Sequence, residues 1–173
     1  LAGGGYSTAM GYATTAIGNY STAMGIGTTA TGIASTATGE GTIATGDYSI
    51  AIGTNSFAKG YGSFSTGLFN DISDNPAPGT PAATDRIFQI GNGVSSARSN
   101  AITVLRNGNT GIGTVSPNAL LQFGNSTSNR KIVLWEGADN DHQFYGFGIN
   151  GSVLRYQTPS VGDDHIFYSG SGA

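Results

Sequence analysis

Small residues alternate with larger ones along the first third of the chain, in a seven-residue pattern that closes on glycine. The pattern is Ser or Thr, a variable residue, Ala, a variable residue, Gly and two further residues. It repeats nine times in register from Ser7 to Gly67, with Ser65 in place of Ala in the last unit. Neighbouring side chains of a strand point to opposite faces, so this alternation predicts short strands. A fixed short period predicts a solenoid.

The small residues of the pattern have to face a narrow interior, because Ser, Thr and Ala are nearly all that fits there. Glycine then allows a bend that a residue with a Cβ would resist. A helix is excluded, because no 3.6-residue period occurs and a glycine at every seventh position would destabilise it.

The outward positions separate the units into two alternating classes, so the expected structural period is 14 residues. One class is the more apolar, and its apolar members are Met10, Met24, Ile50, Ile52 and Phe64. Each coil should therefore carry two short strands on opposite sides of a flattened roll, with coils about 4.8 Å apart. A core of Ser and Ala buries little apolar area, so the apolar face needs a partner. We predict that these five residues form the interface of an obligate oligomer.

The units 49–53 (Ser-Ile-Ala-Ile-Gly) and 56–60 (Ser-Phe-Ala-Lys-Gly) resemble the 14-residue repeat of the YadA-like head of trimeric autotransporter adhesins. This resemblance covers residues 1–67. It implies a left-handed parallel β-roll and three chains side by side, with the more apolar class on the threefold axis. The sequence departs from the family pattern at Thr36 and Thr38, where an apolar pair is expected and a water or ion could fill the gap.

The chain begins inside a repeat, because Leu1-Ala2-Gly3-Gly4 matches the end of a unit. We therefore expect a fragment of a longer fibre. After the β-roll head repeats of residues 1–67, the proline-bearing residues 68–84 are expected to form a linker or neck.

Residues 85–116 are expected to form a small β neck element. Strands are predicted at 87–90, 101–106 and 110–113, and Asn107-Gly108 is a hairpin turn signal between the last two. Residues 117–173 are expected to form a β-rich tip domain, with a second tight hairpin at Asn150-Gly151 and strands at 119–123, 131–136, 143–149, 152–157 and 165–168. The predicted fold class is all-β, a parallel β-roll followed by a small antiparallel neck and tip.

A second resemblance concerns residues 86–93 and 107–117, which are similar to segments that recur in phage and phage-like tail fibres. It covers about residues 85–123. In such fibres, YadA-like heads precede a receptor-binding tip.

Aromatic residues gather in the tip. Sugar-binding sites favour exposed Trp and Tyr faces beside Asp and Asn acceptors, so the candidate receptor contacts are Trp135, Asp139, Asp141, Tyr145 and Tyr156. The alternative interpretation is a packed β core, since alternation along the strands would bury about half of the rings.

Composition excludes several classes of function. The net charge is −3, so no basic surface suggests nucleic acid, and there is no cysteine for a disulfide or a thiolate metal site. No apolar run reaches the roughly 18 residues of a membrane helix, so no membrane insertion is expected from this fragment. The two His-bearing clusters, at 141–142 and 163–165, are interpreted as loop ends, so no metal or cofactor is expected. A flattened roll offers no cleft for a pair of catalytic carboxylates, so no catalytic residue is assigned.

The predicted function is a non-enzymatic, homotrimeric extracellular fibre segment for attachment. Its partners would be two further copies of the chain and a cell-surface glycan or protein receptor. The carrier favoured is a tail fibre of a phage or phage-like particle, and the alternative is a bacterial surface adhesin head. Two other readings are a polysaccharide-degrading tail spike and an ice-binding roll, although Met10 and Ile17 interrupt the Thr ladders that ice binding requires.

Overall fold

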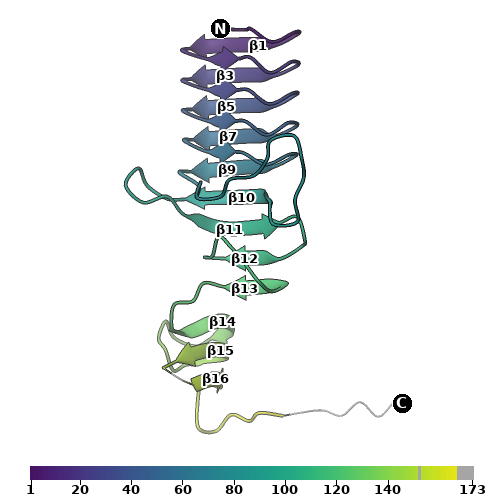
Figure 1. Cartoon of the computed structure of the whole chain (residues 1–173). Coiled ribbons are helices and arrows are strands. Elements are labelled where there is room, and N and C mark those ends of the chain that lie inside the picture. The colour runs from purple at the N-terminus through teal and green to yellow at the C-terminus, as the bar shows by residue number, and fades with distance from the viewer. Residues whose placement is uncertain (152, 167–173) are drawn as a thin grey trace, which may run out of the picture. The chain divides into compact units, whose positions relative to one another are not determined.

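The repeat region forms two rows of strands, because alternate units of the pattern occupy opposite sides of a roll (Figure 1). The longer row consists of β1 (Thr8–Tyr12), β3 (Thr22–Ile26), β5 (Thr36–Glu40), β7 (Ile50–Thr54) and β9 (Phe64–Leu68). The shorter row consists of β2 (Thr15–Ala16), β4 (Thr29–Ala30), β6 (Ile43–Ala44) and β8 (Phe57–Ala58). The structure is a computed structural model that describes residues 1–151 and 153–166.

Strands within each row pair in parallel, with equivalent residues of successive coils opposite each other. Ala23 lies opposite Ala37, and Ala30 lies opposite Ala44. These partners are 14 residues apart, so the predicted 14-residue coil is confirmed.

The core of the roll is a column of alanines bordered by Ser and Thr. The seven alanines from Ala16 to Ala58 at this position of the repeat are 0% exposed, and the Ser and Thr residues from Ser21 to Ser56 are equally buried. The prediction that the small residues face a narrow interior is therefore confirmed.

Close stacking of the coils explains the glycines more fully than a bend does. A Cβ on Gly39 (φ +124°) would lie 2.0 Å from the carbonyl oxygen of Gly53 in the next coil. Gly32, on the other side of the roll, has no positive φ, yet its Cβ would lie 2.1 Å from the carbonyl oxygen of Gly46. Backbone therefore occupies the space of a side chain at both glycine positions, whether or not the chain needs an unusual φ there.

One corner of each coil is a left-handed residue that need not be glycine. Ala13 (φ 53°), Gly27 (φ 61°), Gly41 (φ 60°) and Asn55 (φ 50°) occupy it in successive coils. Nothing in the next coil crowds this corner at Gly27, where the nearest atom to an added Cβ would be 4.0 Å away.

The long sheet continues beyond the repeats. The strands β10 (Arg86–Asn92), β11 (Asn100–Leu105), β12 (Thr110–Ile112) and β13 (Leu121–Phe123) extend it to nine strands in the order β1-β3-β5-β7-β9-β10-β11-β12-β13. β10 pairs with β9 in parallel, and β11 is antiparallel to β10 and β12. The predicted turn at Asn107-Gly108 joins β11 to β12, with Gly108 at φ 92°. The element expected at 85–116 thus shares a sheet with the head.

The segment between β9 and β10 runs back beside the roll (Figure 1). Asp47 N–H donates to the carbonyl oxygen of Pro78 at 3.0 Å, and Asn107 N–H donates to that of Ala83 at 3.0 Å. Its backbone is therefore tied to the roll at one end and to the β11–β12 turn at the other.

Packing divides the chain into two units, Leu1–Gly124 and Asn125–Ala173. The division falls inside the range expected for the tip, 117–173. The second unit holds an antiparallel sheet of β14 (Ser128–Glu136), β15 (Phe144–Asn150) and β16 (Val153–Gln157), in that order. Asn150-Gly151 lies at the β15–β16 turn as predicted, with Gly151 at φ 56°.

The predicted all-β fold class is confirmed, because the described residues contain strands and no helix. Consequently none of those residues belongs to a helix long and apolar enough to cross a membrane. The strand predicted at 165–168 is wrong at His165 and Ile166, which lie outside any strand, and its other two residues lie outside the described residues.

Candidate functional site

Apolar residues form a stripe along the outer face of the long sheet, which Thr36 and Thr38 of β5 interrupt. The five predicted interface residues lie on it in two adjacent columns, with Ile50 opposite Phe64 and Met10 opposite Met24. Met10 is 58% exposed and Ile52 is 40% exposed, so neither side chain packs into the alanine core. The structure thus brings these residues to one surface, and their role in an interface stays a prediction.

The stripe does not stop where the repeat stops. Phe88 of β10 lies opposite Phe64, and their rings stack with centroids 5.7 Å apart. Across β10 to β13 the same two columns are continued by Ile90, Ile102, Val104, Ile112, Leu121 and Phe123. Sequence reasoning missed these residues, although the alternation Phe88-Gln89-Ile90 with an inward Gln89 was the available signal.

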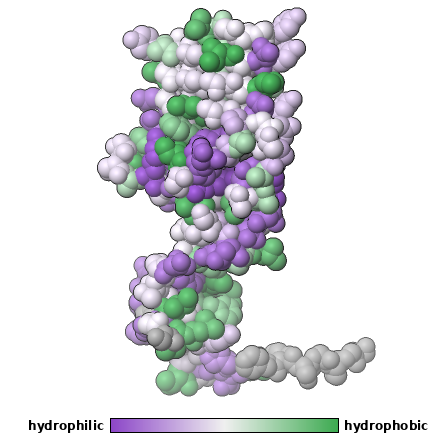
Figure 2. Space-filling view, viewed as in Figure 1, coloured by the Kyte–Doolittle hydropathy of each residue, from purple (hydrophilic) through white to green (hydrophobic). Residues whose placement is uncertain are grey.

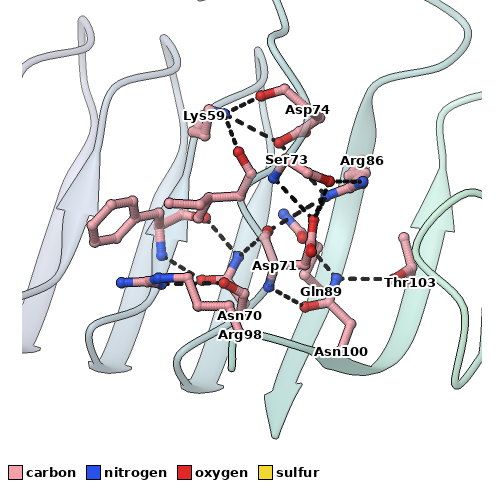
Figure 3. A network of polar contacts seen from close by, with 12 residues as sticks. Lys59, Asn70, Asp71, Ser73, Asp74, Arg86, Gln89, Arg98, Asn100 and Thr103 are labelled. Atoms are coloured by element: carbon pink, nitrogen blue, oxygen red, sulfur yellow. Dashed lines mark hydrogen bonds and ion pairs between the residues drawn. The ribbon is translucent and has the colours of Figure 1, made fainter. Parts of the chain in front are cut away.

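Polar residues concentrate below the repeats. Figure 2 shows pale and apolar atoms over the repeat region and strongly hydrophilic atoms gathered around the level of β9 to β11. Figure 3 resolves this region into a network of polar side chains from the end of the roll, the segment after it and β10–β11.

Asn70 closes the open edge of the shorter sheet. Its side chain occupies the position of the next Ser or Thr and is fully buried. The Phe57 N–H donates to Asn70 Oδ1 at 2.7 Å, and Asn70 Nδ2 donates to the Phe57 carbonyl oxygen at 3.0 Å. One amide side chain thereby replaces the backbone of a further coil against β8.

A buried chain of polar groups replaces the alanine column next to Asn70. Ser65 stands at an alanine position and accepts from Gln89 Nε2 at 3.2 Å. Asn100 Nδ2 donates to Gln89 Oε1 at 2.8 Å and to Thr103 Oγ1 at 3.0 Å. The one departure from Ala in the nine units thus prepares the polar interior that follows.

Ion pairs fasten the segment after β9. Arg86 donates to Asp71 at 2.6 Å, and Lys59 pairs with Asp74 at 3.2 Å. Burial alone would raise the pKa of Asp71, but hydrogen bonds from Ser73 and from the Arg86 guanidinium outweigh it and hold that pKa below its ordinary value. Arg98 lies over the Phe57 ring, 4.6 Å from its centroid. These contacts give the network a structural role.

The aromatic residues of the second unit divide between the two faces of its sheet. Phe144 is fully buried, whereas Trp135 is 56% exposed and Tyr156 is 58% exposed. Trp135 lies opposite Tyr145 on the neighbouring strand, with ring centroids 5.7 Å apart, and Tyr156 meets Phe147 edge to face at 5.2 Å. Three of the predicted receptor contacts therefore lie on the sheet's exposed aromatic face, while Phe144 belongs to the core.

The two predicted acidic contacts lie elsewhere in this unit. Asp139 accepts from Arg130 at 2.6 Å, and this hydrogen bond, with the nearby acidic charges, raises the pKa of Arg130. Asp141 lines a shallow hollow with Thr127, Ser128, Ile149 and Asn150. The acid that the structure places beside Trp135 and Tyr145 is Asp163, which sequence reasoning had assigned to a loop end.

Together these features define a β-solenoid of stacked 14-residue coils with a short antiparallel sheet after it. Residues 2–69 match the YadA head domain repeat, in overlapping matches at 2–28, 25–46, 30–56 and 44–69. This repeat region is therefore a YadA-like head, an adhesin-like segment, as its resemblance implied. No match was found among curated proteins or among solved structures.

Proposed function

We propose that the chain is a non-enzymatic segment of a homotrimeric extracellular fibre that attaches its carrier to a cell surface. The observation that carries the proposal is the apolar stripe, which is exposed along one face of a repeat that matches adhesin heads. Two further copies of the chain would cover it, one stripe facing another around a threefold axis.

The length of the stripe matters to this proposal. Fully burying a Met or Ile side chain contributes about 1.5–3 kcal/mol, so covering the exposed part of a half-exposed one contributes about 1 kcal/mol. Association costs roughly 4–15 kcal/mol in lost freedom. The free energy gained by covering the apolar residues of the head alone barely equals this cost. The apolar residues of β10–β13 continue the stripe and contribute the additional free energy that association needs.

Trimerisation also suits attachment, because three identical tips gain avidity from weak single contacts. The receptor proposed is a cell-surface glycan or protein, contacted through the second unit. Its exposed aromatic face supports that assignment.

For the carrier we propose the tail fibre of a phage or phage-like particle, on the resemblance of residues 86–93 and 107–117 to such fibres. A bacterial surface adhesin is the second candidate, favoured by the match to the YadA head repeat. Antibodies against the chain distinguish the two by electron microscopy of the source culture, because they label either free particles or cell envelopes.

Binding of fluorescently labelled chain to a panel of bacterial and animal cells tests attachment. We expect saturable binding to at least one cell type, competed by unlabelled chain. A charged variant of the stripe, Ile52→Asp, should bind at least 10-fold more weakly because it loses avidity. Absence of saturable binding to every cell type contradicts the proposed function.

A further inference from the structure

A pocket of about 470 Å³ lies in the second unit between the sheet and the loop that follows it. Its apolar wall is made by Trp135 and Tyr145, paired across β14 and β15. Gly137 keeps this wall open, because a Cβ there would lie 3.2 Å from the indole ring. Volumes of this size are typical of small-molecule sites.

The polar wall is held in place by hydrogen bonds around it. Asn140 Nδ2 donates to Gln143 Oε1 at 2.7 Å, which orients the Gln143 amide with its Nε2 as a donor. The Ser160 N–H donates to Asp163 Oδ2 at 2.9 Å, which fixes this carboxylate in the lining of the pocket. An oriented donor and an oriented acceptor thus flank the aromatic wall.

Tyr145 links the two walls. Desolvation, together with a hydrogen bond to the Asp163 carboxylate, raises the pKa of its hydroxyl. The raised pKa favours the protonated hydroxyl, which is a donor toward Asp163.

This arrangement suits a sugar ring, whose C–H face packs on an aromatic face while its hydroxyls exchange hydrogen bonds with carboxylate and amide groups. The negative charge of the second unit and of its pocket indicates which sugars can bind. Residues 125–173 hold three basic and five acidic residues, and the acid in the pocket is a carboxylate. An anionic sugar would be repelled there.

We propose that this pocket binds a neutral hexose or N-acetylhexosamine of a cell-surface glycan. The inference rests on the proposed attachment function and names its ligand class. The ring would lie against Trp135, with hydroxyls bound by Asp163 and Gln143.

The chain has one tryptophan, and it is Trp135, so its fluorescence reports on this pocket directly. The full chain is titrated with the methyl glycosides of glucose, galactose, mannose and N-acetylglucosamine, and with N-acetylneuraminic acid as the anionic comparison. We expect a saturable change with at least one neutral glycoside at millimolar concentration, and a weaker response to the acid. No saturable change with any neutral glycoside, or a stronger response to the acid, overturns the proposal.

Asp163→Asn and Asp164→Asn form a matched pair of variants, because both remove one carboxylate from the same loop but only Asp163 lines the pocket. Asp163→Asn should weaken glycoside binding about 10-fold, and Asp164→Asn should leave it unchanged. Equal affinities in the two variants overturn the proposal. Far-UV circular dichroism verifies that both variants fold.

Acrylamide quenching shows whether assembly leaves the pocket open. We expect Trp135 in the assembled protein to be quenched as an exposed indole, and protection by neighbouring copies overturns the proposal. The failure of attachment itself is distinguishable, because labelled chain would then bind no cell. Cell binding that is equally strong for wild type and Asp163→Asn refutes the pocket and leaves attachment standing.

Discussion

Replacing one glycine of the stacked column, Gly39→Ala, should disrupt the roll, because the new Cβ would lie 2.0 Å from the Gly53 carbonyl oxygen. Real Cβ atoms do not approach this closely, so the coils must separate by about 1 Å or more at this point. Two inter-coil backbone hydrogen bonds would then be weakened, at about 1 kcal/mol each. Strain at φ +124° adds about 1–3 kcal/mol.

The expected loss for Gly39→Ala is therefore about 3 kcal/mol, after a gain of about 0.4–1 kcal/mol from the less flexible unfolded chain. Gly27→Ala is the matched control. Its φ is +61°, its added Cβ meets no atom closer than 4.0 Å, and Ala13 occupies the equivalent corner naturally. Left-handed strain of about 1 kcal/mol is nearly cancelled there by the same unfolded-state gain.

Urea unfolding followed by far-UV circular dichroism, at one protein concentration, measures both variants. Because the next coil crowds Gly39 and not Gly27, we expect a clearly lower midpoint for Gly39→Ala and a midpoint near wild type for Gly27→Ala. Equal midpoints would refute the claim that coil spacing, and not backbone flexibility, demands the glycine.

Three further predictions concern the surface and the polar network. Ile52→Asp should dissociate the assembly, whereas Ile17→Asp on the opposite face should not. The two side chains are a matched pair, because they are 40% and 50% exposed. Size-exclusion chromatography with light scattering measures both variants. Asn70→Ala should lower the free energy of unfolding by about 2 kcal/mol, because the Phe57 amide loses its buried partner; an unchanged urea midpoint would contradict the capping role. The pKa of Asp71 is lowered by folding, so its contribution to stability is present above its ordinary value of 3.8 and is lost as the pH falls below it. Asp71→Asn should therefore flatten the acid side of the melting-temperature profile, and an unchanged profile would count against the Arg86 ion pair.

Local repetition made the roll predictable. The inward alanines, the 14-residue period and both hairpin turns follow from spacing that a reader can count, because each repeat meets only its neighbours. The reason for the glycines could not be predicted from this regularity. Gly32 needs no special backbone angle, and an added Cβ there is excluded only by the backbone of the next coil.

Contacts between residues far apart in the chain could not be predicted from the sequence. Asn70 reads as the residue that breaks the pattern, yet it completes the sheet through an amide that mimics backbone. Asp163 reads as part of a loop, and only folding brings it to Tyr145. The extension of the stripe into β10 depends on the parallel pairing of Phe88 with Phe64 across a long intervening segment.

If three chains join along the apolar stripe, the mass of the protein in solution shows it most directly. Sedimentation equilibrium of the whole chain should give a single species of three times the 17.5 kDa chain mass. A stable, monodisperse species at 17.5 kDa, with the stripe open to solvent, would contradict the account.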